Sequence, residues 1–355
     1  MDLSQNTVSL LEQFPQAVFL VKDDVVVYAN PMARSRGVFE NAALSDLIAI
    51  GLQEYDNFQS GKLMLTTVAS GIQYNSIVTN YDQYRIFCME SAYSLPEFRA
   101  FANAAQTLRA PLSNISIGID ELLPAPSIQQ SPELLSQVKS VNKSLHELLR
   151  AVRNMSDVGT VGSYGVSEVK DISAILSALT EKANTLFAST SRKICFEPSK
   201  QPIFCLVNQE NLERAILNLI SNAIKYADDN HQAIQLSVHQ GISRLYISVQ
   251  SECRHAKELL DSSLFSGFAR EPSISDGASG IGLGLTIVHN IATAHKGTLL
   301  IEQPSENSLR FTLSVAATKP QSCTVKSPIM HIDNNGGFDL FLVELAEVLP
   351  PEVFG

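Results

Sequence analysis

The sequence lacks several features that assign a chain to a class at once. Its 355 residues include no tryptophan, and its few cysteines are scattered without a CxxC pair: Cys88, Cys195, Cys205, Cys253 and Cys323. This pattern matches neither a disulfide framework nor a zinc site, so we expect reduced thiols in a cytoplasmic protein. The first histidine of the chain is His146, which excludes a histidine-ligated haem in the N-terminal part. Cys88 lies in a strand pattern, and we interpret it as a buried structural cysteine rather than a haem or flavin ligand.

Long apolar runs and basic clusters are also missing. No stretch of about 20 apolar residues is present, so no membrane-spanning helix is expected, and the N-terminus MDLSQNTVSLLEQ lacks the pattern of a signal peptide. The net charge is −10, without clustered Lys and Arg, so we do not expect nucleic-acid binding. Apolar residues make up 45% of the chain, which is enough for the cores of two or three domains.

The first 90 residues alternate between strand patterns and turns. Lys22-Asp23-Asp24 separates two short apolar runs and predicts a hairpin. A helical region is expected over 31–50. The expected strands are 17–21, 25–30, 62–69, 72–80 and 83–90. We therefore predict a small α+β domain over residues 1–93.

From Leu95 onward the apolar period becomes helical, with a break at 124–132. Two long helices joined by a short loop form a hairpin over 94–156. One hairpin cannot bury both of its apolar stripes. Either a helical subdomain of the same chain covers them, or two hairpins form a four-helix bundle in a twofold homodimer. We favour the dimer, because no further long helices follow nearby.

The rest of the chain reads as a linker, an α/β domain and a tail. Residues 157–167 are rich in Gly and Ser and predict the linker. Residues 168–318 alternate between strand and helix patterns, interrupted by a loop at 251–280. A loop of that length in a compact domain is usually functional, such as a lid. In the tail, 319–355, only 337–349 is patterned as a short helix.

The stretch LNLISNAIKYA, 217–227, places several polar side chains on one face of an apolar helix. Asn218, Asn222, Lys225 and Tyr226 recur at spacings of three and four residues. An Asn oxygen can bind Mg²⁺ and a lysine can meet a phosphate, so Asn222 is a candidate metal ligand. The alternative is a helix that exposes these groups to water.

A glycine-rich stretch, SGIGLGL, provides a second half of a nucleotide site. Gly280, Gly282 and Gly284 precede a helix that starts near Leu285. Glycines allow backbone N–H groups to approach phosphate oxygens, and the helix N-terminus favours negative charge. The motif is weak alone. Its combination with the Asn helix and the intervening loop indicates a nucleotide site.

This combination resembles the sensor histidine kinases of two-component signalling. LNLISNAIKYA resembles their N box, GIGLGL their G2 box, LFSGFAR (264–270) their F box and TLRAPLSNI the end of their H box. FPQAVFLVKDDVVVYANPMA resembles the opening of a PAS domain. The resemblance covers about 10–318. It implies a multidomain α+β protein with a PAS-like sensor domain, a dimeric four-helix bundle, a GHKL or Bergerat-type ATPase domain that is an α/β sandwich, and a response-regulator partner.

The chain differs from this family at the positions that take part in phosphoryl transfer. Counting back from Pro111 places Gln106 at the phosphoacceptor histidine. An amide nitrogen is no nucleophile, so Gln106 cannot replace imidazole. The acidic residue that follows the histidine is replaced by Thr107, and the residue used for phosphatase activity by Ala110. We interpret His146 as a surface polar residue rather than a relocated acceptor.

The G1 box, which contacts adenine in the family, is degenerate as well. Ser251 takes the place of its aspartate, and Cys253 and His255 take the places of two glycines. Losing one buried hydrogen bond costs about 1–3 kcal/mol, and the bulkier residues are expected to crowd the pocket. We therefore expect ATP and Mg²⁺ to bind weakly.

Three functions fit these observations. The favoured one is a pseudokinase that binds and modulates a response regulator or partner histidine kinase, with Arg109, Pro111 and Leu112 in the docking surface. The second is an ATP-binding kinase that phosphorylates a histidine on a partner chain. The third is a ligand-sensing dimerisation module outside any phosphorelay.

Overall fold

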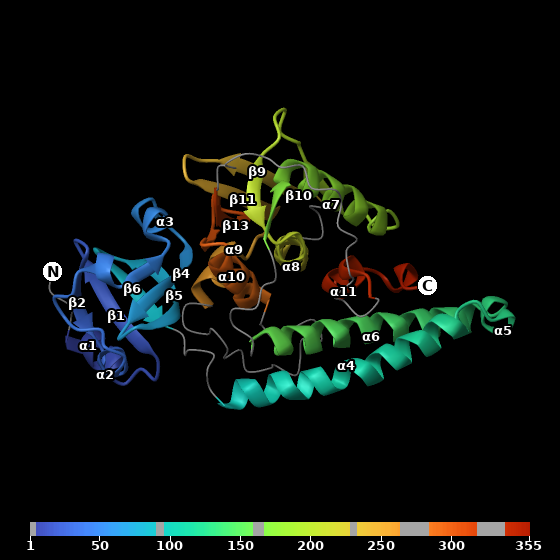
Figure 1. The fold of residues 1–355 in the computed structure, drawn as a ribbon, viewed down its shortest axis with the longest axis horizontal. Coiled ribbons are helices and arrows are strands. Elements are labelled where there is room, and N and C mark those ends of the chain that lie inside the picture. Colours follow the sequence, from blue (N-terminus) through green and yellow to red (C-terminus); the bar gives the residue numbers. More distant parts are fainter. Residues whose placement is uncertain (1–4, 90–95, 159–166, 228–232, 263–283, 318–337) are drawn as a thin grey trace.

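The computed structural model describes residues 5–89, 96–158, 167–227, 233–262, 284–317 and 338–355. Figure 1 shows an N-terminal α+β part, a long helical hairpin and an α/β part. The C-terminal helix, α11, lies between the hairpin and helix α8 of the α/β part (Figure 1).

The N-terminal part is an antiparallel sheet of order β2-β1-β6-β5-β4, with the short β3 paired to β4. The predicted hairpin is confirmed, because Asp23 and Asp24 adopt the left-handed conformation between β1 and β2. The region predicted as helical, 31–50, is helical only in part, since it ends in a strand that pairs with β4. The elements are α1 (Gln5–Glu12), β1 (Ala17–Lys22), β2 (Val25–Ala29), α2 (Pro31–Ser35), η1 (Leu44–Asp46), β3 (Ile48–Ile50), α3 (Leu52–Asp56), β4 (Lys62–Ala69), β5 (Ile72–Tyr81) and β6 (Tyr84–Met89).

The hairpin consists of α4 (Pro96–Leu122) and α6 (Pro132–Val158), joined through the short α5 (Pro126–Gln129). Helix α4 continues without a break through Pro111. Apolar side chains pack between the two helices: Ala105, Leu112, Ile119, Leu145, Leu149 and Val152. A second set faces outward at seven-residue spacing on each helix: Leu108, Ile115, Leu122, Leu134, Val141 and Leu148.

The α/β part has a mixed sheet of order β12-β13-β11-β10-β8, in which only β8 and β10 run parallel, and a separate pair β7-β9. Helices α7, α8 and α10 pack against it and share one hydrophobic core with the strands. The elements are β7 (Glu168–Asp171), α7 (Ile172–Leu186), β8 (Lys193–Phe196), β9 (Phe204–Val207), α8 (Gln209–Tyr226), β10 (Ala233–Gln240), β11 (Arg244–Glu252), α9 (Ala256–Ser262), α10 (Gly284–Ala294), β12 (Leu299–Glu302) and β13 (Ser308–Ala316).

The two sheets join edge to edge. Strand β4 of the N-terminal part pairs antiparallel with β12, so that Met64 faces Leu299 and Leu63 faces Leu300. The side-chain amide of Asn75 donates to Asn290 at 3.0 Å across this junction. The result is one continuous 11-stranded sheet.

The tail contributes α11 (Leu340–Leu345) and the short η2 (Pro351–Val353). Asp339 caps α11, because its side chain accepts a hydrogen bond from the N–H of Phe341 at 2.8 Å. In the described part of the tail, six apolar side chains are buried in the core of the α/β part: Leu340, Phe341, Leu345, Ala346, Leu349 and Phe354. Within the described part of the chain, no helix has the length and apolarity needed to cross a membrane.

Candidate functional site

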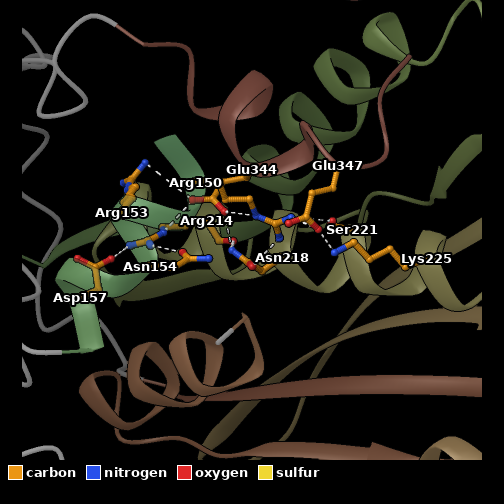
Figure 2. Close-up of polar contacts among 10 residues, drawn as sticks. All are labelled: Arg150, Arg153, Asn154, Asp157, Arg214, Asn218, Ser221, Lys225, Glu344 and Glu347. Atoms are coloured by element: carbon orange, nitrogen blue, oxygen red, sulfur yellow. Dashed lines mark hydrogen bonds and ion pairs between the residues drawn. The ribbon is translucent and has the colours of Figure 1, made fainter. Parts of the chain in front are cut away.

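Helix α8 carries the predicted asparagine motif. It begins after Asn208, whose side chain accepts from the N–H of Asn211 at 2.9 Å and so caps the helix. Leu217, Ile220 and Ile224 are buried in the core of the α/β part. The opposite face turns toward helices α6 and α11, as Figure 2 shows. Protein covers the polar face at Asn218, whereas Asn222, Lys225 and Tyr226 are half-buried.

Asn218 is fully buried, and three protein groups use its side-chain amide. Its Nδ2 donates to Glu344 Oε2 at 2.7 Å and to the backbone oxygen of Arg214 at 3.1 Å. Its Oδ1 accepts from Arg150 Nη2 at 2.9 Å (Figure 2). The side-chain oxygen of Asn218 is thus bound by a guanidinium and its N–H group by a carboxylate. The side chain has little capacity left to bind a further ligand.

Glu344, on α11, is the centre of this cluster and has no exposed surface. Arg214 Nε donates to its Oε1 at 2.8 Å, Arg150 Nε lies 3.5 Å from its Oε2, and Arg153 Nη1 lies 3.9 Å from its Oε1. Burial alone would raise the pKa of this carboxyl group. The nearby Arg214, Arg150 and Arg153 outweigh burial, so its pKa lies below its ordinary value.

A second acidic side chain of the tail, Glu347, reaches the other end of the motif. It forms an ion pair with Lys225 and another with Arg150, whose Nη1 lies 3.0 Å from Glu347 Oε2. Burial, together with the positive charge of Arg150, lowers the pKa of Lys225 to about 8. The lysine that the sequence assigned to a phosphate thus contacts a carboxylate of the same chain.

Two further acidic side chains complete the cluster. Arg214 forms an ion pair with Asp157 and donates to Asn154 Oδ1 at 3.0 Å, while Arg153 Nη2 donates to Glu210 Oε1 at 2.9 Å. Among the described residues, the cluster joins four cations to four carboxylates: Arg150, Arg153, Arg214 and Lys225 with Asp157, Glu210, Glu344 and Glu347. Guanidinium groups in this arrangement recognise carboxylate or phosphate oxygens.

The glycine-rich end of the predicted site lies against the same helix. A Cβ atom on Gly284, the first residue of α10, would lie 3.2 Å from Asn218 Oδ1 and 3.8 Å from Asn222 Nδ2. Asn222 is half-buried. Leu285 and Tyr226 both pack against the core of the α/β part. Gly280, Gly282 and the stretch LFSGFAR lie outside the described residues.

The three residues at the degenerate adenine position have different environments. Ser251 is buried near the end of β11, and its Oγ has no hydrogen-bond partner among the described residues. Cys253 is buried in the core. The side chain of His255 is 71% exposed and lies 3.2 Å from Glu258. Its place in an adenine pocket stays a prediction.

The acceptor position of the hairpin faces solvent. Gln106, Thr107 and Ala110 are exposed on α4, and the Thr107 hydroxyl donates to the backbone oxygen of Ala104 at 2.7 Å. Among the predicted docking residues, Arg109 and Pro111 are exposed. Leu112 packs inside the hairpin with 5% exposure, so its side chain is not available to a partner.

His146 is not the surface residue that we predicted. It is 6% exposed, and its ring packs against Phe338 and Phe354 of the tail. Its Nδ1 lies 2.9 Å from the backbone oxygen of Asn142. The prediction was wrong because the tail, which lies about 200 positions away in sequence, covers this face of α6.

The described residues hold no group of three or more His, Cys, Asp or Glu side chains arranged for a metal ion. Asn222 therefore stays a predicted Mg²⁺ ligand on the grounds of its motif alone. The four cysteines in the described part of the chain, Cys88, Cys195, Cys205 and Cys253, are free thiols. Cys88 is buried, and its Sγ donates to Gln16 Oε1 at 2.9 Å.

Sequence reasoning missed the charged side chains that surround Asn218. Arg150 and Arg153 lie one turn apart within the apolar stripe of α6, and Glu344 and Glu347 lie one turn apart within the apolar run of the tail. A charged side chain within an apolar stripe is rarely buried unless it pairs with an opposite charge. The sequence pattern could therefore have predicted buried ion pairs here, but it does not say which residues pair.

Part of the α/β region matches a known protein family. Residues 207–319 match the family described as histidine kinase-, DNA gyrase B- and HSP90-like ATPase. The adaptive-response sensory kinase SasA of Synechocystis sp. is 25% identical over 227 residues, which cover 60% of this chain and 58% of that protein. The sensor histidine kinase RppB of the same organism is 25% identical over 60% of this chain and 48% of its own length. The chain thus spans less than two thirds of these relatives.

Two solved structures show a weaker likeness. Full-length ShkA in complex with AMPPNP is 18% identical with a TM-score of 0.43, over 63% of this chain and 46% of that one. The histidine kinase ThkA in complex with the response regulator protein TrrA is 16% identical with a TM-score of 0.39, over 89% and 99%. At these scores the two likenesses support no argument about the present chain.

Proposed function

Because the chain is a histidine-kinase-like protein with a GHKL-type ATPase domain, we propose that it is a two-component signalling protein without autophosphorylation. It acts by binding a response regulator or a partner histidine kinase and modulating its phosphorylation. The observation that carries this proposal is the residue at the acceptor position. Gln106 lies there, exposed on α4, and Thr107 and Ala110 are exposed on the same helix. None of these side chains can accept or activate a phosphoryl group as imidazole and its acidic neighbour do.

The proposal assigns a role to each part of the chain. Residues 1–93 form a PAS-like sensor domain, which the antiparallel order β2-β1-β6-β5-β4 supports. Residues 94–156 form the dimerisation hairpin. Residues 157–167 are the linker, 168–318 the ATPase-like domain, and 319–355 a tail whose end packs on that domain.

A homodimer follows from the apolar surface of the hairpin. Leu108, Ile115 and Leu122 are each about half exposed at seven-residue spacing on α4, and α6 has a matching series. A seven-residue repeat of this kind is typical of a helix seam. Two copies that bury these stripes against each other form a four-helix bundle, with Arg109 and Pro111 left on its surface for a partner.

The competing function is a kinase that phosphorylates a histidine on a partner chain. This function is supported by the motif residues expected to bind phosphate, because Gly284 lies directly against Asn218 and Asn222. The evidence against it is that Asn218 and Lys225 already bind side chains of the same chain.

A binding measurement tests the favoured function. The full chain is immobilised and titrated with the receiver domains of the response regulators from the same organism. We expect one receiver domain to bind with micromolar affinity, and Arg109→Ala to weaken this binding at least tenfold. Ile242→Ala, at a position that is 97% exposed in the α/β part, serves as the matched control. If no receiver domain and no histidine kinase of the organism binds, the proposed function is wrong.

A further inference from the structure

The buried cluster gives the C-terminal tail a role that the proposed function does not include. Helix α11 is held by charge rather than by apolar contact alone: Glu344 faces three guanidinium groups, and Glu347 reaches Lys225 and Arg150. Arg150 and Arg153 come from α6, Arg214 and Lys225 from α8, and Glu344 from α11, while Glu347 follows the end of α11. Figure 2 shows the two carboxylates of the tail above the polar face of α8.

The positions that these carboxylates contact belong to the nucleotide motif. Asn218 and Lys225 are two of the polar residues that the sequence assigns to a metal-bound polyphosphate. Glu344 takes a hydrogen bond from the first, and Glu347 pairs with the second. A carboxylate and a phosphate present the same kind of oxygen acceptor to an arginine or a lysine.

Charge balance strengthens the comparison. With the tail in place, four cations meet four carboxylates. Without Glu344 and Glu347, the four cations of the cluster would keep two of its four carboxylates, Asp157 and Glu210. The region between α6 and α8, with two of the cations on each helix, would then carry an excess of two positive charges beside Asn218. A buried excess of this kind is unfavourable unless an anion replaces the lost carboxylates.

We propose that residues 338–355 act as an internal anionic ligand that occupies the phosphate side of the ATPase-like domain. The polyphosphate of a nucleotide and the pair Glu344/Glu347 compete for the same cations, so nucleotide binds only when α11 leaves. This inference rests on the assignment of α8 to a nucleotide site, and not on the binding of a response regulator, which the receiver-domain titration tests separately.

The test measures the affinity of the full chain for Mg·ATP by calorimetry. We compare the wild type with Glu344→Gln, Glu347→Gln and the control Glu352→Gln. Glu352 belongs to the same tail, but its side chain is exposed and only its backbone oxygen accepts, from Lys139. Competition predicts that Glu347→Gln binds Mg·ATP at least tenfold tighter than the wild type, and Glu344→Gln tighter still, while Glu352→Gln matches the wild type.

Two results would overturn the proposal. One is equal Mg·ATP affinity, or equal absence of binding at millimolar ATP, in Glu347→Gln and the wild type. The other comes from hydrogen exchange on Glu347→Gln: if saturating Mg·ATP leaves the amides of 340–345 as protected as before, nucleotide and tail do not compete. If Glu344→Gln fails to fold, Glu347→Gln still tests the proposal. The side chain of Glu347 is 25% exposed, and its substitution leaves Glu344 in place.

Discussion

Glu344 joins three helices that are far apart in the sequence. Its carboxylate contacts Arg150 and Arg153 of α6 as well as Arg214 and Asn218 of α8. A buried ion pair adds little when it is compared with an apolar pair of the same volume, but removal of one partner leaves the other charge unpaired. The side chain therefore links the tail, the hairpin and the α/β part, in addition to the apolar contacts of the tail.

The first prediction concerns the stability of this junction. Glu344→Gln keeps the shape of the side chain but removes its charge, so we expect a loss of about 3–5 kcal/mol in the free energy of unfolding. Urea denaturation followed by circular dichroism measures it. Glu352→Gln should change the stability by less than about 0.5 kcal/mol, as expected of an exposed site. Equal stability of the two variants would contradict the central position of Glu344.

Acid should weaken the same contact. The pKa of Glu344 is lowered in the folded protein, because its three arginines outweigh the opposing effect of burial. A lowered pKa adds stability above the ordinary carboxyl value, and this contribution is lost as the pH falls through the folded value. We thus expect the stability difference between the wild type and Glu344→Gln to shrink below about pH 4.3.

His289 provides the second prediction at this scale. It is fully buried on α10, neither ring nitrogen has a hydrogen-bond partner among the described residues, and burial lowers its pKa to about 4. The folded protein therefore holds a neutral ring, and stability is lost as the pH falls from about 6.5, where the unfolded chain binds the proton.

The measurement compares urea denaturation of the wild type and His289→Leu at pH 7.5 and pH 5.5. Between these values the wild type should lose about 1.4 kcal/mol more than the variant, which corresponds to one proton over one pH unit. An equal loss in both proteins would show that His289 does not titrate as its burial requires.

At the scale of elements, the outward stripes of the hairpin lead to the third prediction. Ile115→Asp and Val141→Asp place a charge in the proposed seam between two hairpins, where burial of an unpaired carboxylate is unfavourable. Light scattering should give twice the 38.7 kDa chain mass for the wild type and the single mass for both variants. Ile242→Asp, on an equally apolar but isolated residue, should remain a dimer. A monomeric wild type would exclude the bundle.

The junction between β4 and β12 is the second element with a clear consequence. Glu54 is buried there, with its Oε1 2.8 Å from Ser314 Oγ and 3.1 Å from Arg244 Nε. Loss of this carboxylate removes the acceptor of the Ser314 hydroxyl and the charge that faces Arg244 in a buried site.

The fourth prediction follows from this contact. We expect Glu54→Ala to lower the free energy of unfolding by about 2–4 kcal/mol and to separate one cooperative thermal transition into two, seen by calorimetry. Gln53→Ala, which removes only an exposed hydrogen bond to Ser243, is the control. A single unshifted transition in Glu54→Ala would mean that the two sheets do not depend on each other.

The local elements could be predicted from the sequence, whereas their long-range contacts could not. The strand over 62–69 and the asparagine helix have strong local periodicity, and both lie where that periodicity places them. The edge pairing of β4 with β12 involves residues more than 230 positions apart. No local pattern determines such a pairing, because an exposed strand edge can accept any partner strand.

The site shows the same division. Asn218, Asn222 and Gly284 could be brought together by their motifs, and the structure places Gly284 beside both asparagines. The arginines of α6 and the glutamates of the tail could not be assigned to the site, because their proximity depends on how α11 packs between two other parts of the chain. The burial of His146 was missed for the same reason.

At the scale of the whole molecule, the parts form a histidine-kinase-like chain. In the function that we propose, the acceptor position carries the amide of Gln106, and carboxylates of the tail occupy the phosphate side of the ATPase-like domain. We propose that such a chain binds a signalling partner without a phosphorylation step of its own.

The most direct test of this account is an autophosphorylation assay. The full chain is incubated with Mg²⁺ and γ-labelled ATP, and label that is stable to alkali and labile to acid is measured, with an active histidine kinase in parallel to validate the assay. We predict no such label on the chain, since Gln106 provides no nucleophile at the acceptor position. Label of this kind on the wild-type chain would contradict the account, because a histidine elsewhere in the chain would then accept phosphate.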